Sequence, residues 1–448
     1  MKFSRRFMLK TMGLGTGAWF LSPNIVRNTV ANPRGSDQFF IFCYFGGGWD
    51  QLLALDPRDP GKFSDSRIRE TKIQLGYDRL EDPFSKEPIM PSGSNIMYGP
   101  AAAPIAKHFD KSCVVRGVAM DTVSHTVGRR YFLTGMMPRG QNAVGSSLPT
   151  WLVSEQGEHS PVPNLVVGVE TYNRKLPAFA SGLRVGNVGD LLSTLSDGPQ
   201  SPKDKVREFL EVYRSQNHNC DPASLDDDGL FQIIRSSQKS ARVMISKNLS
   251  RYFNFMGGAD EMVKIRERYD FRSMNSSGAQ AAMAYQALRQ GVSQSVTIQL
   301  AGGLDTHGDN WNTSQPERLH SGFQALSVLV DDLSKTPHPF SEGKTMMDTT
   351  TIMCFSEFAR TPMLNNNNGR DHWLASSILL MGAGIPHNKV VGATTDTGMN
   401  PSAINPQTGT PEKNGLIITP TRIAASLMES AGYSPDAFRV SGIPCLKG

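Results

Sequence analysis

The chain has 448 residues, of which 39% are hydrophobic and 19% are charged, and its formal net charge is +5 at pH 7. The excess of positive charge lies at the N-terminus, because residues 1–31 hold five basic residues and no acidic one. Without them the 46 basic residues fall to 41, which equals the number of acidic residues. We therefore expect no nucleic-acid partner, since phosphate binding needs a basic surface.

The first 31 residues have the pattern of a twin-arginine signal peptide. Residues 4–10 read Ser-Arg-Arg-Phe-Met-Leu-Lys, residues 11–26 are apolar and rich in glycine, and residues 29–31 offer a small-residue cleavage site. The alternative is a basic amphipathic helix that stays attached. The apolar run is short for a membrane span, and no other run is long enough. The pattern predicts a periplasmic or extracytoplasmic protein without a stable membrane span, whose partner during export is the twin-arginine translocase.

The five cysteines fall into two groups by their surroundings. Cys43, Cys113 and Cys354 lie in apolar runs, so we expect them to be buried small hydrophobic residues. Cys220 and Cys445 lie in polar surroundings, and whether they pair in an oxidising compartment stays open. The spacing typical of a structural zinc site is absent from the sequence.

Short apolar runs alternate with helical patterns along most of the chain. The apolar runs cover residues 38–45, 112–118, 163–168, 295–300, 349–355 and 378–381, and the helical patterns include 100–109, 315–334 and 420–432. Continuous apolar runs are typical of strands buried on both faces of a parallel sheet. The alternation predicts an α/β fold with a doubly wound, mostly parallel sheet, in one domain over residues 32–448.

Residues 200–292 interrupt this alternation. They are polar, and their helical patterns at 203–216, 230–253 and 279–290 predict a helical insertion in the domain. Two roles stay open for the insertion, a lid beside the site or an appendage that only packs on the sheet.

Two segments share one pattern, in which a strand is followed by a Gly-Gly turn, a large apolar residue and an aspartate. They cover residues 42–51 and 297–306, and their aspartates are Asp50 and Asp305. Ligands of open parallel sheets bind outside the carboxyl ends of the strands, so both aspartates are candidates for a site there. The alternative is ordinary turn chemistry, in which the aspartate caps the next element.

Further carboxylates and histidines follow the later strands. His307 comes two residues after Asp305, Glu357 follows the run 349–355 directly, and Asp371 and His372 follow four asparagines and a glycine. Such carboxylate and imidazole groups on short turns bind divalent cations. The pattern predicts a divalent metal ion, Zn, Mn, Mg or Ca, as the cofactor, and the predicted ligands are Asp50, Asp305, His307, Glu357, Asp371 and His372. For Asp371 the alternative is a role in orienting His372.

The segment Ser124-His125-Thr126 follows the run 112–118 at the start of a helical pattern. Hydroxyls and an imidazole at the positive end of a helix suit an anion, which makes these three residues catalytic candidates; the alternative is a surface helix with solvated arginines. Arg360 is the fourth candidate, as a clamp for an anionic group, although a structural ion pair with Glu357 is the alternative.

These motifs together resemble the exported family catalogued as domain of unknown function 1501. The motifs are the export signal, residues 47–50, 124–135 and 302–307, residues 356–362 (Ser-Glu-Phe-Ala-Arg-Thr-Pro) and residues 369–373 (Gly-Arg-Asp-His-Trp). The family looks related to the alkaline phosphatase and sulfatase superfamily, which implies a doubly wound sheet and a site for one or two divalent metals. In that comparison Asp50 matches the aspartate after the first strand, His372 matches the last histidine ligand, and Phe358 stands in place of a histidine.

The sequence therefore predicts an exported metal-dependent hydrolase of a phosphate or sulfate ester. Ser124, His125 or Thr126 would supply a nucleophile or a proton shuttle, or a metal-bound water would attack directly, and the metal would polarise an anionic small-molecule or glycan ester. The alternative is a non-catalytic periplasmic binding or scaffold protein with a degenerate metal site, which Phe358 favours.

Overall fold

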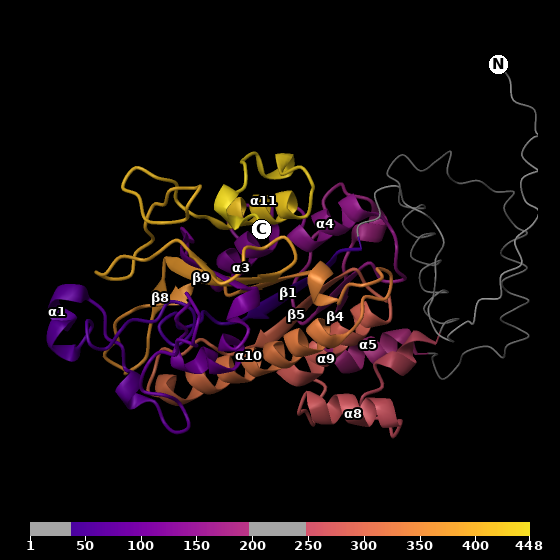
Figure 1. The fold of residues 1–448 in the computed structure, drawn as a ribbon, viewed down its shortest axis with the longest axis horizontal. Coiled ribbons are helices and arrows are strands. Elements are labelled where there is room, and N and C mark those ends of the chain that lie inside the picture. The colour runs from indigo at the N-terminus through magenta and orange to yellow at the C-terminus, as the bar shows by residue number, and fades with distance from the viewer. Residues whose placement is uncertain (1–36, 197–247) are drawn as a thin grey trace, which may run out of the picture.

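The computed structural model describes residues 37–196 and 248–448, and one eight-stranded sheet runs through them (Figure 1). The order of its strands is β10-β2-β9-β6-β1-β5-β3-β4. Their bounds are β1 Phe39–Phe45, β2 Ser112–Ala119, β3 Asn164–Val167, β4 Leu183–Val185, β5 Ser295–Ala301, β6 Thr350–Phe355, β9 Ala375–Gly382 and β10 Lys389–Val391. β9 runs antiparallel to both of its neighbours, and every other pair is parallel. The predicted α/β fold with a mostly parallel sheet is confirmed.

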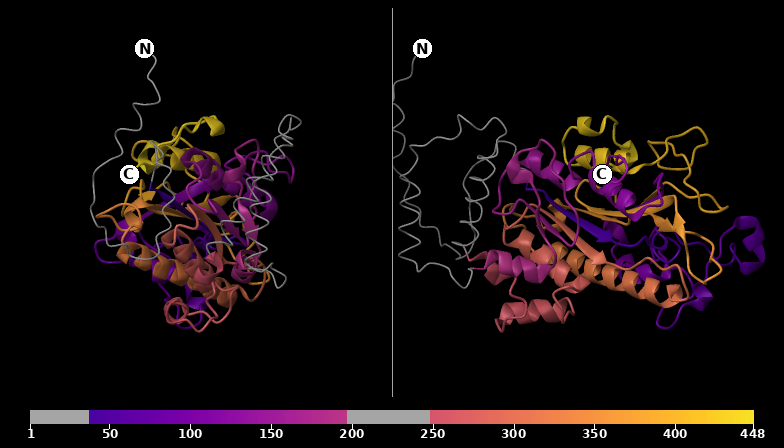
Figure 2. Two further views of the ribbon diagram at one scale, coloured as in Figure 1. Left: turned by 90° about the vertical axis from the view of Figure 1, so that its right-hand side faces the viewer. Right: turned by 180° about the vertical axis from the view of Figure 1, so that it is seen from behind.

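Helices cover both faces of this sheet. On one face lie α3 (His125–Thr134), α4 (Leu148–Gln156) and α11 (Pro420–Ser430), and on the other lie α5 (Val188–Leu195), α9 (Ser277–Arg289) and α10 (Trp311–Lys335). The side view in Figure 2 shows α11 and its yellow C-terminal segment on one side of the sheet and the orange helices on the other. The chain therefore forms three layers, as expected of a doubly wound sheet.

The central strand β1 explains why both faces are covered. Phe39, Ile41, Cys43 and Phe45 contribute to the core on the α9–α10 side, whereas Phe40, Phe42 and Tyr44 contribute to the core on the α3–α11 side. Successive side chains of a strand point to opposite faces, so a continuous apolar run has to be buried twice.

The observed elements match the sequence patterns closely, with three differences. The strands β4 and β10 have three residues each and carry no clear apolar run. The pattern at 100–109 forms only the short helix α2 (Ala103–Ala106), flanked by 3₁₀ turns. A further pair of two-residue strands, β7 (Ala359–Arg360) and β8 (His372–Trp373), lies outside the main sheet.

Most of the predicted insertion lies outside the described residues, including the whole pattern at 203–216. Its described part contains α8 (Asp260–Arg268) and α9, and residues 278–284 of α9 are all buried. α9 packs against β5 and α10, so it belongs to a layer of the main fold. The division of the chain into a domain and an insertion stays a prediction.

Cys43, Cys113 and Cys354 are buried, as expected, and Cys445 is buried and forms no disulfide with a described residue. Cys220 lies outside the described residues, and so does the predicted signal peptide at 1–31. Among residues 37–196 and 248–448, no helix has the length and apolar character needed to cross a bilayer.

The directions of the strands bring the predicted site residues to one edge of the sheet. β1, β2, β5 and β6 point the same way, so their carboxyl ends share this edge. β9 runs the other way, so its amino end lies there, directly after the short strand β8. Loops from five strands therefore meet where ligands of such sheets bind.

Candidate metal centre

The turns after β1 and β5 hold each other in place. The backbone N–H of Gly46 donates to the carbonyl of Ala301 at 2.8 Å, and the N–H of Leu304 donates back to the carbonyl of Gly46 at 3.0 Å. Gly47 has a φ of +116°, and a Cβ atom there would lie 2.5 Å from the nitrogen of Leu304. Only glycine fits this backbone conformation and lets the two turns come so close together. This contact holds the residue before Asp305, and so places Asp305 at the carboxyl edge of the sheet.

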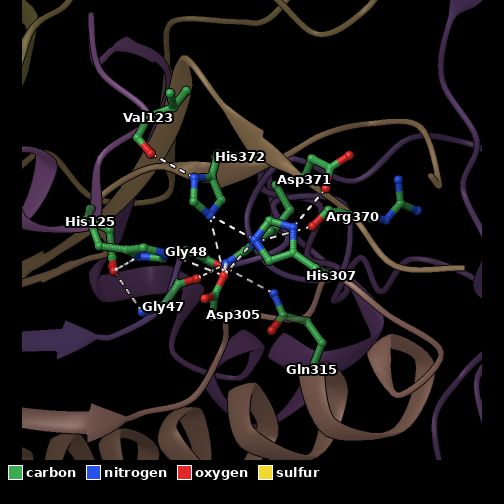
Figure 3. A network of polar contacts seen from close by, with 12 residues as sticks. Gly47, Gly48, Val123, His125, Asp305, His307, Gln315, Arg370, Asp371 and His372 are labelled. Atoms are coloured by element: carbon green, nitrogen blue, oxygen red, sulfur yellow. Dashed lines mark hydrogen bonds and ion pairs between the residues drawn. The ribbon is translucent and has the colours of Figure 1, made fainter. Parts of the chain in front are cut away.

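The Oδ1 atom of Asp305 is surrounded by nitrogen atoms (Figure 3). The guanidinium of Arg360 lies at 2.5 Å and the Nε2 atom of His307 at 2.9 Å, while the Nε2 atoms of His125 and His372 both lie at 3.4 Å. Partial burial raises the pKa of Asp305, but the hydrogen bond and charge of Arg360 outweigh it and lower the pKa to about 2. Asp305 is therefore anionic at neutral pH.

Each of the three histidines is held by an acceptor at its Nδ1 atom. The carbonyl of Val123 lies 2.7 Å from His372, a carboxylate oxygen of Asp371 lies 2.8 Å from His307, and one of Glu357 lies 2.8 Å from His125. An acceptor at Nδ1 requires the proton there, so the neutral ring presents a lone pair at Nε2. Burial and the charge of Arg360 lower the pKa of His372, which favours its neutral form.

Three Nε2 lone pairs thus face one carboxylate oxygen. The Nε2 atoms of His307 and His372 are only 3.0 Å apart, and the buried Nε2 atom of His125 has no hydrogen-bond partner in the described part of the chain. A single shared proton satisfies the pair of His307 and His372, and His307 also accepts a hydrogen bond from Arg360 at 3.2 Å, whereas a cation would satisfy His125 and His372 together. Ligand atoms of His125, Asp305 and His372 lie within 4.8 Å of one another, so these three residues form a group suited to hold a metal ion.

Glu357 supports this group from below and is not one of the three. Its side chain is 1% exposed, and it accepts hydrogen bonds from His125, from the backbone of Gly47 at 2.9 Å and from the hydroxyl of Ser356 at 3.0 Å. Burial raises the pKa of Glu357, but these hydrogen bonds, led by that of His125, lower it below its usual value. The carboxylate therefore orients His125, as carboxylates commonly do for metal-binding histidines. Asp371 occupies the same position beside His307.

Arg360 lies in the centre but has no surface for a ligand. Its side chain is fully buried, and its five donors are used by the carbonyls of Gly47, Gly48 and Arg370 and by Asp305 and His307. The structure places it against Asp305 and not against Glu357. Arg360 is thus suited to position Asp305 and is not suited to clamp an anionic substrate.

Asp50 is separated from the group by its own contacts. Its side chain is 1% exposed, accepts hydrogen bonds from the indole of Trp311 at 2.8 Å and from the backbone of Leu52 and Leu53, and forms an ion pair with Arg370 at 2.8 Å. It caps the turn that follows, which was the alternative interpretation of this pattern. The structure therefore does not bring Asp50 together with the other predicted ligands.

The position that the resemblance assigns to a histidine is filled by a packing residue. Phe358 is fully buried, and its ring centroid lies 4.8 Å from that of His125 and 4.5 Å from that of His372. The ring forms an apolar floor that fixes the planes of both imidazoles.

The remaining predicted residues lie at the start of α3. His125 is the first residue of the helix, and Ser124 is its N-cap residue but makes no capping hydrogen bond through its side chain. Thr126 is half-buried beside His125. The sequence missed His125 as a metal-ligand candidate, although its place after β2 was a usable signal, because β2 ends at the same edge.

A hollow of about 380 Å³ opens beside the group. His125, Asp305 and Glu357 line one part of it, and Arg129, Glu170 and Arg184 are among the other residues that line it. Neither Glu170 nor Arg184 was among the site residues predicted from the sequence. Both come from the β3–β4 edge, where the sequence pattern is weak.

Comparison with known proteins gives a family assignment. The family model described as "Protein of unknown function (DUF1501)" matches residues 38–407. The chain belongs to this family. No curated protein sequence matches it.

Several solved structures are similar to this chain in fold at low sequence identity. The lipoteichoic acid synthase LtaP from Listeria monocytogenes has 7% identity and a TM-score of 0.37, with 92% of this chain and 76% of that one covered. A 2-O GAG sulfatase has 8% identity and a TM-score of 0.36, with coverages of 89% and 71%. A mutant of the TAB5 alkaline phosphatase with Mg bound has 8% identity and a TM-score of 0.33, with coverages of 89% and 99%. No residue role is transferred from these structures to the DUF1501 chain.

Proposed function

We propose that this protein is a metal-dependent hydrolase of a phosphate or sulfate ester. The observation that carries the proposal is the convergence of three imidazole Nε2 atoms on the Oδ1 atom of Asp305. Each imidazole is held at Nδ1 by a carboxylate or a carbonyl, which is the arrangement that metal-binding histidines use. His125, Asp305 and His372 are the proposed ligands. Two imidazoles and one carboxylate suit Zn or Mn better than Mg or Ca.

The chain supplies the groups that ester hydrolysis needs around such an ion. A divalent cation there would polarise an ester oxygen and neutralise developing charge. The hydroxyls of Ser124 and Thr126 lie at the positive end of α3, where they are the candidates for a nucleophile. His307 is 44% exposed and paired with Asp371, so it is suited to carry a proton between the site and solvent.

One observation favours the second candidate, a non-catalytic binding protein with a metal site. The buried ring of Phe358 takes the place of an imidazole. Among the described residues, moreover, neither Ser124 nor Thr126 makes a side-chain hydrogen bond to the group. In this second function the protein would bind the metal but would not hydrolyse an ester.

Metal analysis of protein purified from an exporting host separates these functions. We expect stoichiometric metal and turnover of a panel of phosphate and sulfate esters that is lost on chelation, and such turnover would rule out the binding-only function. The hydrolase proposal is wrong if no metal is found and the double variant Asp305→Ala/His307→Ala leaves ligand binding and stability unchanged.

We also propose that residues 1–31 direct the folded protein to the periplasm through the twin-arginine translocase. The support is the paired Arg5 and Arg6 with the apolar run that follows. The variant Arg5→Lys/Arg6→Lys should keep the protein in the cytoplasm in a cell fractionation assay. Export that is unaffected by this change would contradict the proposal.

A further inference from the structure

The hollow beside the metal centre is larger than an ester group requires. Its volume of about 380 Å³ lies in the range of pockets that hold whole small molecules. Backbone of Gly46, Gly47 and Gly168 and the side chain of Gln299 line it together with the charged residues. A ligand whose ester group meets Asp305 therefore has room for a second functional group within the same hollow.

On the side of the hollow away from Asp305 and Glu357, arginines of α3 and β4 surround a single carboxylate, Glu170. Glu170 accepts hydrogen bonds from Arg129 at 2.9 Å, from Arg130 at 3.1 Å and from the hydroxyl of Tyr172 at 2.8 Å. Partial burial raises the pKa of Glu170, but these hydrogen bonds outweigh it and lower the pKa to about 2, so this carboxylate is ionised. Glu170, Arg129 and Arg130 thus carry a net charge of +1 together, and of the two arginines Arg129 lines the hollow.

Arg184 adds a second positive charge and has donors to spare. Its Nε atom donates to the carbonyl of Val169 at 2.9 Å, and the residue is exposed at the hollow. Within residues 37–196 and 248–448, no carboxylate forms an ion pair with it. The backbone hydrogen bond at Nε anchors the side chain and leaves the two terminal nitrogens for a ligand. A guanidinium offers this pair of donors to a carboxylate, sulfate or phosphate in a bidentate geometry.

We propose that Arg184 determines specificity by binding a second anionic group of the ligand, so that the substrate is an ester that carries another negative charge. That the ligand is an ester rests on the proposed function, whereas its second anionic group is inferred from Arg184 and its surroundings alone. Arg360 cannot take this role, because its side chain is fully buried and its donors are used within the protein. The proposed ligand is a small organic ester with an anionic substituent, which is either a carboxylate or a sulfate-like group.

The test is a binding comparison with matched probes. Alkyl phosphates of several chain lengths, each ending in a carboxylate, a sulfonate or a neutral carboxamide, are titrated into the full-length protein with added Zn or Mn. At the best chain length we expect an anionic probe to bind about tenfold more tightly than its carboxamide, the usual value of one charge-assisted contact. The relative affinity of carboxylate and sulfonate identifies the second group.

Substitutions at Arg184 show whether this residue causes the preference for anionic over neutral probes. Arg184→Gln should reduce the preference to less than about threefold, and Arg184→Lys should keep part of it. Arg422→Gln is the matched control, because Arg422 is half-buried on α11 and donates to a single carbonyl, that of Ser441. Thermal unfolding of each variant shows that the fold is retained.

The outcomes separate this inference from the proposed function. Equal binding of anionic and neutral probes at every length, or a preference that survives in Arg184→Gln, overturns the inference even when esters are hydrolysed. A preference that depends on Arg184 in a protein that binds no metal and hydrolyses no ester supports the inference and refutes the hydrolase.

Discussion

The two Gly-Gly turns at the ends of β1 and β5 begin alike and lead to different chemistry. Asp50, after the first turn, is 1% exposed and is bound by Trp311, by backbone N–H groups and by Arg370. Asp305, after the second, is 48% exposed and faces three imidazoles. The same sequence pattern thus gives one buried structural carboxylate and one carboxylate placed to bind a ligand.

The difference teaches what decides the role of such an aspartate. Both turns lie at the carboxyl edge of neighbouring strands, so position in the fold does not separate them. The partners do: the donors around Asp50 all belong to the core, whereas Asp305 has one buried donor, Arg360, and three imidazole nitrogen atoms around it. We expect mutations to act on stability at the first aspartate and on metal binding at the second.

The largest effect should follow Asp50→Ala. Removing this carboxylate leaves the fully buried guanidinium of Arg370 without its ion-pair partner, and breaking a buried pair in this way costs about 3–5 kcal/mol. Urea denaturation measures the loss in free energy of unfolding. Asp305→Ala is the comparison variant and should cost less, about 1–3 kcal/mol, because its carboxylate is half exposed and the buried Arg360 keeps its bonds to the carbonyls of Gly47, Gly48 and Arg370. Equal losses in the two variants would remove the contrast between the turns.

The next effect concerns the proposed ligands. His372→Ala should weaken binding of Zn or Mn by more than about 100-fold, since even an outer partner of a ligand is worth about 10–100-fold. Isothermal titration with the metal alone measures this change. His387→Ala is the control, because this exposed histidine has one hydrogen-bond partner among the described residues, the carbonyl of Gly382. Unchanged metal affinity in His372→Ala would mean that the imidazoles are linked by protons alone.

A smaller effect is expected at the carboxylate that orients His125. Glu357→Gln keeps the shape of the side chain but removes the charge behind the imidazole, so metal affinity should fall about tenfold. Asp371→Asn makes the same change beside His307, but Asp371 is 54% exposed, so we expect a weaker response. The reverse order of the two variants would show that His307, and not His125, is the ligand.

The smallest effect on stability is expected at Glu170, which belongs to neither Gly-Gly turn. There the free energy of unfolding should depend on pH. The pKa of Glu170 falls from 4.5 to about 2 on folding, so the folded state favours the ionised form. The contribution is therefore present above about pH 4.5 and is lost as the pH falls through about 2. Glu170→Gln should lower the free energy of unfolding at pH 7 by on the order of 1 kcal/mol. In urea denaturation across this range the difference from the parent protein should shrink towards zero; a constant difference would exclude the charge as its cause.

The sequence predicted the central sheet because its buried strands are long and apolar on both faces. β1 and β6 are continuous runs of such residues, and their patterns differ from the observed bounds by one residue. β4 and β10 were missed because three residues at a sheet edge need no continuous apolar run. The direction of β9 was also not predictable, since a run buried on both faces reads the same whether the strand is parallel or antiparallel.

The site was predictable as a set of residues but not as a set of roles. The loops that carry Asp305, His307 and His372 follow or precede central strands, so their meeting at one edge follows from the topology. Which groups present lone pairs depends on partners far away in sequence, such as the carbonyl of Val123 for His372. No local pattern encodes such contacts, which is why the sequence offered Glu357 as a ligand candidate while the group that the geometry brings together contains His125.

The antiparallel course of β9 has a consequence for how insertions and deletions act on this protein. Only one residue, Leu374, separates β8 from β9, so the register of β9 in the sheet also determines which way His372 points. That register is set by the alternation of Ile378 and Leu380 towards one core and Leu379 and Met381 towards the other. Adding or removing a single residue at Leu374 would set the register of β9 against the pairing of β8 with β7, in which His372 lies opposite Arg360. The spacing between the apolar core and the metal centre is therefore as much a determinant of the site as the histidine itself.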